Sequence, residues 1–179
     1  QVSLDSAFSK RVYVDGWLSS AYSVMDKIGE FSEPFRWAAD DLYHPDMKEY
    51  HEGNYSADNQ FSDSDQNESR LWKYYEGIRK ASTFVNNVDM CPELTMDEKA
   101  DMKGQARFLR AYCYWALMRV YGPVPLIPLE GLDVNLSYEE LSLPREHFDV
   151  LVDFVDKELT EAARSLPTKR TVNNLGRPT

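Results

Sequence analysis

The segment 95–128 constrains the fold more than any other part of the chain, because it predicts one long helix with a defined start and a defined end. Thr95 and Glu98 have the spacing of a capping box, in which each side chain binds a backbone N–H that the first helical turn leaves free. Gly122 can adopt a left-handed cap, and the prolines that follow it prevent the helix from continuing. The sequence therefore predicts a helix that begins near Met96 and ends at Gly122.

This helix carries apolar residues on more than half of its circumference. Two neighbouring stripes recur at helical spacing, and they consist of Met102, Ala106, Leu109, Cys113, Ala116, Leu117 and Val120 in the first and Phe108, Tyr112 and Trp115 in the second. A helix with two apolar stripes needs neighbours on two sides, which stacked helix pairs provide. Arg107 and Arg110 fall on the polar side, and we expect them to pair with carboxylates of adjacent helices or with carbonyl groups.

The rest of the chain predicts three further helices and one long irregular segment. A first helix ends near Gly29, a second spans 68–88, and a fourth spans 144–165 with Pro144 in its first turn. The second helix is expected to bury Leu71, Tyr75, Ile78, Ser82 and Val85. The segment 43–67 has no sustained period and is rich in Asp, Asn, Ser and Gly, so it predicts a loop. Together these patterns predict an all-α fold.

The two cysteines are predicted to be free thiols. Cys113 lies about 25 Å along the axis of the long helix at 1.5 Å per residue, whereas Cys91 precedes that helix. A disulfide requires Cα atoms within about 7 Å of each other. Cys113 is therefore expected to be a small core residue.

Three segments that follow one another along the chain carry a family signature. The first is WKYYEGIRKA at 72–81. The second is QARFLRAY at 105–112, followed by YG at 121–122 and VPLI at 124–127, and the third is the helix that runs from LPR at 143–145 to LP at 166–167. These segments resemble the SusD/RagB family of outer-membrane nutrient-binding lipoproteins. Two positions depart from the family pattern: Ser82 or Thr83 stands where the family often has Ala-Asn, and Glu158 stands where it usually has Asp.

The resemblance implies an architecture and a function. It implies tetratricopeptide-like antiparallel helix pairs with a long irregular loop insertion, of which residues 1–179 would be the N-terminal portion. It also implies non-enzymatic capture of an oligosaccharide or polysaccharide at the outer-membrane surface, with hand-over to a TonB-dependent transporter. The family is lipid-anchored through a cysteine that this chain does not contain. No cofactor and no catalytic residue are implied.

Aromatic and polar residues gather in the predicted loop, and we expect them to contact the glycan. They are Tyr43, Tyr50, His51, Tyr55, Asp58, Asn59 and Phe61. An aromatic face can pack on the C–H side of a sugar ring, while carboxylates and amides bind its hydroxyl groups. Packing of the same aromatic residues against the helices is the structural alternative for each of them.

Charge and motifs exclude several other functions. The formal net charge of −10 argues against nucleic acid and against anionic lipid head groups, since both would be repelled. Asp63, Asp65 and Asn67 have the first spacings of a calcium loop, but the required glycine and the final glutamate are missing. His44 and His51 with their neighbouring glutamates fit no metal-binding spacing. Phosphate-binding, dinucleotide-binding and hydrolase-elbow motifs are also missing from the sequence.

Two alternative functions remain compatible with the sequence. A peptide-binding or other nutrient-binding helical-repeat protein would be favoured if the concave helix surface, and not the irregular insertion, carried exposed polar and aromatic residues. A glycoside hydrolase would need two carboxylates about 5 to 9.5 Å apart around a cleft. The sequence offers no candidate pair for the second alternative.

Overall fold

The chain is all-helical in the part that the computed structural model describes, which comprises residues 3–25, 41, 43, 45, 48–54, 70–133, 135–171 and 176–179. The elements are α1 (Leu4–Ala7), α2 (Arg11–Tyr22), α4 (Lys48–His51), α5 (Arg70–Asn87), the 3₁₀ turn η2 (Val88–Met90), α6 (Met96–Tyr121), α7 (Tyr138–Leu141) and α8 (Phe148–Ser165). Within these ranges every regular element is a helix, as the sequence predicted.

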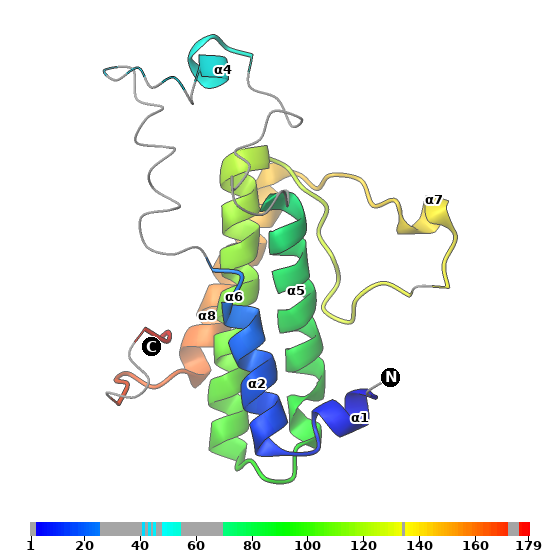
Figure 1. Ribbon diagram of the computed structural model, residues 1–179, viewed down its shortest axis with the longest axis vertical. Helices are drawn as coiled ribbons and strands as arrows, with labels where there is room; N and C mark the ends of the chain where they lie inside the picture. The colour runs from blue at the N-terminus through cyan, green and yellow to red at the C-terminus, as the bar shows by residue number, and fades with distance from the viewer. Residues whose placement is uncertain are drawn as a thin grey trace.

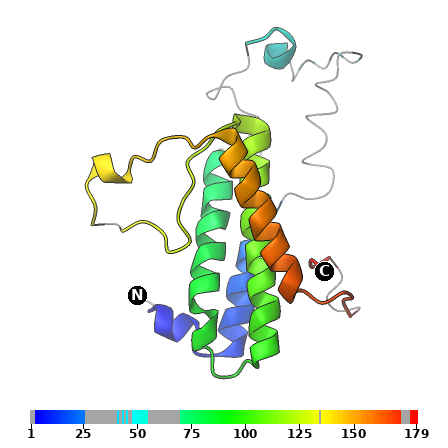
Figure 2. The same ribbon diagram turned by 180° about the vertical axis from the view of Figure 1, so that it is seen from behind.

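Four of these helices form an antiparallel bundle around α6. In Figure 1, α2 and α6 run upward while α5 and α8 run downward, with α2 in front of α6 and α5 beside it. Figure 2 shows α8 crossing the opposite side of α6. Helix α6 thus has neighbours on two sides, which is the arrangement that its two apolar stripes predicted. The arrangement confirms the predicted antiparallel helix pairs.

Both ends of α6 lie where the sequence places them. The Thr95 hydroxyl accepts a hydrogen bond from the Glu98 N–H at 3.3 Å, and a Glu98 carboxylate oxygen accepts the Thr95 N–H at 2.9 Å. Gly122 caps the other end with φ 65° and ψ −130°. The positive φ is the conformation that glycine adopts without steric cost, although this ψ lies outside the left-handed helical region that we expected.

The first apolar stripe of α6 is buried except at Val120, which is half-buried, but the second stripe and the polar side differ from the prediction. The buried stripe residues are Met102, Ala106, Leu109, Cys113, Ala116 and Leu117. Trp115, which we assigned to the second stripe, is exposed, whereas Arg110 is only 2% exposed. The stripe assignment for Trp115 was therefore wrong, because α8 covers the Arg110 side of α6 and leaves Trp115 to solvent.

The arginines of α6 bind a carboxylate of α8, as expected from the sequence. Arg107 Nη1 donates to Glu158 Oε1 at 2.8 Å, and Arg110 Nη1 lies 3.5 Å from Glu158 Oε2. Arg110 also donates to the Ile127 carbonyl at 2.7 Å and lies 4.8 Å from the ring centre of Phe154. This buried cluster connects α6, α8 and the segment after α6.

Helix α5 buries more of its surface than the sequence pattern indicated. Ile78, Ser82 and Val85 are buried as predicted, whereas Leu71 and Tyr75 are only half-buried. The additional fully buried residues of α5 are Tyr74, Ala81 and Phe84. Helix α5 contacts both α6 and α2, and its half-buried Tyr75 donates to the Pro125 carbonyl in the segment that follows α6.

The first helix ends earlier than predicted. We expected it to continue to near Gly29, but α2 ends at Tyr22. The hydroxyl of Ser20 donates to the Trp17 carbonyl at 2.9 Å, and that of Ser23 donates to the Ser20 carbonyl at 2.7 Å. Serine side chains that bind nearby carbonyls compete with the helical hydrogen bonds, and Ser23 does so at the C-cap of α2.

The fourth helix begins later than predicted. We placed Pro144 in its first turn, but α8 begins at Phe148, with His147 as its N-cap. The Glu146 N–H donates to the Val124 carbonyl at 3.1 Å, so the preceding residues pair with the distant segment after α6. Between α6 and α8 the short helix α7 forms, with its own capping box at Ser137 and Glu140.

Cys91 and Cys113 are both buried and neither forms a disulfide, which confirms the prediction that they are not bridged. Among the helices that the structure describes, none combines the length and the apolar character that crossing a bilayer requires.

The capping box predicts how stability depends on pH. The Thr95 N–H, together with the Arg11 guanidinium at 2.7 Å, holds the pKa of Glu98 below its ordinary value of 4.5. Because the folded pKa is the lower one, this stabilisation is complete above pH 4.5 and is lost as the pH falls through the folded pKa. We expect Glu98→Gln to flatten the acid side of the curve of unfolding free energy against pH, measured by urea denaturation.

Asp97→Asn is the matched control for this prediction, since Asp97 lies in the same helical turn but outside the capping box. Its acid slope should remain close to that of the wild type. A Glu98→Gln slope equal to the wild-type slope would contradict the prediction.

Candidate functional site

An extended segment after α6 is fastened to α5 and α6 by side chains. Prolines at 123, 125 and 128 have no N–H, so this segment cannot continue as a helix. Its carbonyls accept hydrogen bonds instead: Pro125 from Tyr75 at 2.9 Å, Ile127 from Arg110 at 2.7 Å, and Leu129 from the Asn86 amide at 2.8 Å. These bonds fix the position of the segment beside α5.

Two tyrosine hydroxyls within this framework remain protonated. Burial raises the pKa of Tyr114 to about 12, and its hydroxyl accepts the Ile127 N–H at 2.8 Å. Burial also raises the pKa of Tyr75 above its ordinary value. Both hydroxyls are therefore neutral at physiological pH, and the two hydrogen bonds that they form with the segment involve uncharged tyrosine side chains.

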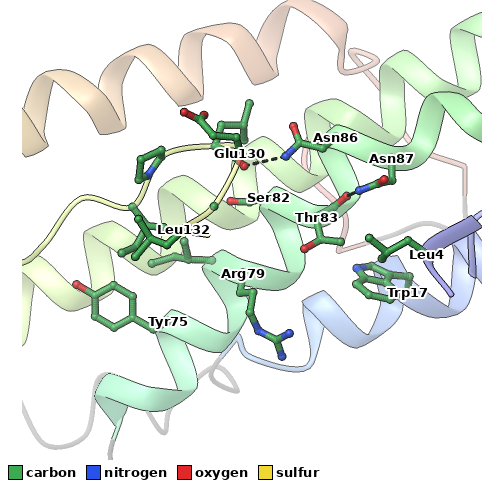
Figure 3. A pocket seen from close by; sticks show the side chains of 15 residues that line it. Leu4, Trp17, Tyr75, Arg79, Ser82, Thr83, Asn86, Asn87, Glu130 and Leu132 are labelled. Carbon is green, nitrogen blue, oxygen red and sulfur yellow. Dashed lines mark hydrogen bonds between the residues drawn. The ribbon is translucent and has the colours of Figure 1, made fainter. Parts of the chain in front are cut away.

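Between α5 and this segment lies a cavity of about 640 Å³, which we call the α5 groove. Its walls are the outward side of α5 from Tyr75 to Asn87 and the segment 127–132. Leu4 and Trp17 line it where α1 and α2 approach α5. Figure 3 shows Tyr75 and Trp17 at opposite ends of the labelled residues. This volume falls in the range of ligand sites.

Ser82 is the most informative residue in the groove. Its side chain is 5% exposed, and its hydroxyl has no hydrogen-bond partner among the described residues. In Figure 3 the Ser82 hydroxyl points from α5 toward the segment that carries Glu130. A buried polar group without a partner costs free energy, so the position favours a ligand or water that supplies one.

The other lining residues combine flat aromatic surface with polar groups. Tyr75 and Trp17 are half-buried, and the Trp17 indole N–H donates to the Lys80 carbonyl at 3.0 Å, which fixes its ring. Arg79 is exposed, and Asn86 uses its amide to hold the Leu129 carbonyl. Further polar groups come from Thr83, Asn87 and Glu130. Such a lining suits a ligand with apolar C–H faces and many hydroxyl groups.

The structure brings three of the seven predicted site residues together. The rings of Tyr43 and His51 are 5.4 Å apart, and those of Tyr50 and His51 are 6.0 Å apart. Tyr43 and Tyr50 are exposed, and α4 carries Tyr50 and His51. We call these three residues the loop cluster. Figures 1 and 2 both draw α4 beyond the end of the helical bundle. Tyr55, Asp58, Asn59 and Phe61 lie outside the described residues.

Within the described part of the chain, no three His, Cys, Asp or Glu side chains gather as metal ligands. The imperfect calcium pattern at Asp63, Asp65 and Asn67 lies outside that part, as does His44.

The α5 groove was not predicted as a site from the sequence. Ser82 was placed among the buried residues of its helix, and the sequence does not indicate which buried serine finds a hydrogen-bond partner. The sequence contained one signal at this place: Ser82 or Thr83 stands where the family often has Ala-Asn. Ser82 lines the groove together with the segment 127–132.

Comparisons with known proteins give a consistent result. A family of SusD-like proteins, described as starch-binding and associating with the outer membrane, matches residues 5–179. SusD-like protein P25 of Formosa agariphila is 30% identical over 77 residues, which cover 41% of this chain and 15% of that protein.

Two solved structures from Bacteroides fragilis resemble this one. A SusD-like protein superposes with a TM-score of 0.72 and 23% identity, over 98% of this chain and 33% of that one. A SusD-like carbohydrate-binding protein superposes with a TM-score of 0.54 and 28% identity, over 69% of this chain and 22% of that one. The chain therefore spans no more than about a third of the length of these relatives.

Proposed function

The chain belongs to the SusD-like family of starch-binding proteins that associate with the outer membrane, and from this premise we propose that it captures oligosaccharides or polysaccharides for import. In this proposal the protein is lipid-anchored at the extracellular face and is not an enzyme. It binds the glycan and passes it to a TonB-dependent transporter in the same membrane. The observation that carries the proposal is the family match over residues 5–179.

The α5 groove supports the proposal as the place where the glycan binds. A sugar ring has hydroxyl groups at its edge and C–H groups on its faces, so it needs hydrogen-bonding groups and a flat apolar surface close together. Ser82 offers an unpartnered hydroxyl, and Tyr75 offers an aromatic face within the same cavity. The segment 127–132 is held in place by Tyr75, Arg110 and Asn86, so the groove is largely formed before the ligand arrives.

The loop cluster is proposed as an additional glycan contact. Tyr43 and Tyr50 are exposed, and their rings both approach His51, so the three side chains present a joint aromatic surface. Tyr55, Asp58, Asn59 and Phe61 remain part of this proposal from the sequence alone.

A peptide ligand is the second candidate, and one observation favours it. Helix α5 presents exposed polar residues such as Arg79 and Asn86 beside half-buried aromatic ones, which is part of the feature that we named for a helical-repeat peptide binder. The insertion also carries exposed aromatic residues, Tyr43 and Tyr50, which that feature excludes. The relative described as carbohydrate-binding supports the glycan instead. Both candidates predict a ligand in the groove, so binding experiments with both ligand classes separate them.

The test is calorimetric titration of the full-length protein with a panel of oligosaccharides and with a mixed peptide library. The panel includes α-1,4-glucans, β-linked glucans and charged polysaccharide fragments. Binding to at least one glycan, without release of shorter sugars, is the expected result. Binding to peptides and to none of the glycans would contradict the proposal, and so would cleavage of the bound glycan.

Ser82→Ala provides the sharpest variant, because its effects on stability and on binding are expected to have opposite signs. Removing a buried hydroxyl without a partner should leave the free energy of unfolding unchanged or raise it by up to about 1 kcal/mol. Losing one hydrogen bond to the ligand should weaken glycan binding by a factor of about 2 to 10. Denaturation and calorimetry measure the two quantities on the same sample.

Ser165→Ala is the matched control, since the Ser165 hydroxyl already donates to the Ala162 carbonyl on α8, away from the groove. It should leave glycan binding unchanged. Tyr43→Ala tests the loop cluster separately, and it should weaken binding without affecting unfolding. Wild-type affinity in Ser82→Ala would remove the groove from the proposal.

A further inference from the structure

A second hollow adjoins the α5 groove and shares its wall. Its volume is about 480 Å³, and Tyr75 and Ile127 line both hollows. It extends from Tyr75 toward the beginning of α5 and toward the loop that carries α7. Figures 1 and 2 both show that loop on the α5 side of the bundle. The two hollows therefore follow one another along the same face of the protein.

The second hollow is lined by aromatic side chains that are exposed to solvent. Trp72 in the first turn of α5 is 71% exposed, and Tyr138 at the start of α7 is 86% exposed. Tyr121 and Tyr75 add two partly exposed rings. Large aromatic residues gain free energy when they leave water, so their exposure in one hollow indicates a surface that a ligand covers.

Polar groups in the same hollow limit the chemistry of that ligand. Arg145 lines it and is exposed, and its charge lies close enough to Tyr75 to lower the pKa of that hydroxyl against the larger effect of burial. Ser142 is also part of the lining. Flat aromatic faces combined with an arginine and a hydroxyl match the faces and edges of sugar rings better than an apolar helix or a lipid chain.

The length of the combined surface exceeds that of a single sugar. From Trp72 to Asn87, α5 advances by 15 residues, or about 22 Å at 1.5 Å per residue. Trp72 at one end of this stretch lines the second hollow, and Asn87 at the other end lines the α5 groove. Trp72 and Ser82 are 10 residues apart on α5, or about 15 Å along its axis at 1.5 Å per residue, so a ligand that contacts both at the same time must be an extended chain.

We propose that the hollow lined by Trp72 and Tyr138 is a second glycan subsite, continuous with the α5 groove, and that the ligand is a linear oligosaccharide long enough to occupy both. This inference rests on the proposed function and adds the length of the ligand to it. The α5 groove holds one part of the chain through Ser82. The exposed aromatic residues stack on the next part.

The test measures how affinity depends on ligand length. The full-length protein is titrated with a disaccharide and with a heptasaccharide of the glycan class that it binds, maltose and maltoheptaose for the starch class. The wild type should bind the heptasaccharide at least about tenfold more tightly. Trp72→Ala and Tyr138→Ala should remove most of this gain while changing disaccharide binding less than about twofold. Ser82→Ala should weaken both ligands.

Phe148→Ala is the control, because Phe148 is an exposed aromatic residue at the start of α8 and lines neither hollow. It should leave both affinities unchanged. Equal affinity of the wild type for both ligands would overturn the inference and leave the proposed function standing, as would an undiminished length dependence in Trp72→Ala. Failure to bind any glycan would overturn the proposed function itself, and the inference with it.

Discussion

Replacing Arg110 by alanine is expected to lower the free energy of unfolding by about 3–5 kcal/mol, because it leaves a buried carboxylate without one of its partners. Glu158 is 6% exposed and would keep only the half-exposed Arg107. The Ile127 carbonyl would also lose its hydrogen bond at 2.7 Å. Since that bond holds the segment beside α5, the variant should weaken glycan binding as well. Urea denaturation and calorimetry measure the two effects.

Two controls separate the buried pair from a general effect of removing charge. Arg164→Ala removes an exposed arginine that pairs with Glu161 on the same helix, and it should cost no more than about 0.5 kcal/mol. The double variant Arg110→Met with Glu158→Leu replaces both charges by apolar groups and should recover most of the stability. A loss below about 1 kcal/mol in Arg110→Ala would contradict our description of the cluster.

Gly77→Ala is expected to destabilise the protein although alanine is the better helix former. A Cβ atom at Gly77 would lie 2.7 Å from Val24 Cγ2 and 2.8 Å from Cys113 Sγ. Valine has no flexible end that can move aside, so helix α5 would have to shift away from its neighbours. Overpacking of this kind costs about 1–3 kcal/mol, which exceeds the gain of about 1 kcal/mol in helix propensity.

Gly16→Ala is the matched control on α2, where a Cβ atom meets no other atom within 4 Å. It should stabilise the protein by about 0.5–1 kcal/mol, since only the propensity changes. The difference between the two variants, measured by thermal or urea denaturation, isolates the packing at Gly77. Stabilisation by both substitutions would contradict the close approach of α5 to its neighbours.

The sequence predicted those features of the fold that depend on local rules. The capping box at Thr95 and Glu98 and the stop at Gly122 involve residues that are near one another in the chain, and α6 begins and ends at those positions. The start of α8 was wrong by four residues because the Glu146 N–H binds the distant Val124 carbonyl. No local pattern contains that bond.

The sequence predicted that the arginines of α6 would pair with acceptors, but it predicted neither their partner nor the groove. An arginine on a helix that is mostly buried must find an acceptor, so pairing of Arg107 and Arg110 with an adjacent carboxylate could be predicted. The identity of Glu158 depends on the register between α6 and α8, which the sequence does not specify. The role of Ser82 depends on what lies opposite its hydroxyl, and this follows only from the path of the segment 127–132.

The central claim is that the α5 groove receives the glycan, and a crystal structure of the full-length protein with a bound oligosaccharide tests it most directly. We predict a sugar ring against Tyr75 with one of its hydroxyl groups within hydrogen-bond distance of Ser82 Oγ. An oligosaccharide bound elsewhere, with the groove between α5 and the segment 127–132 left to solvent, would contradict the claim.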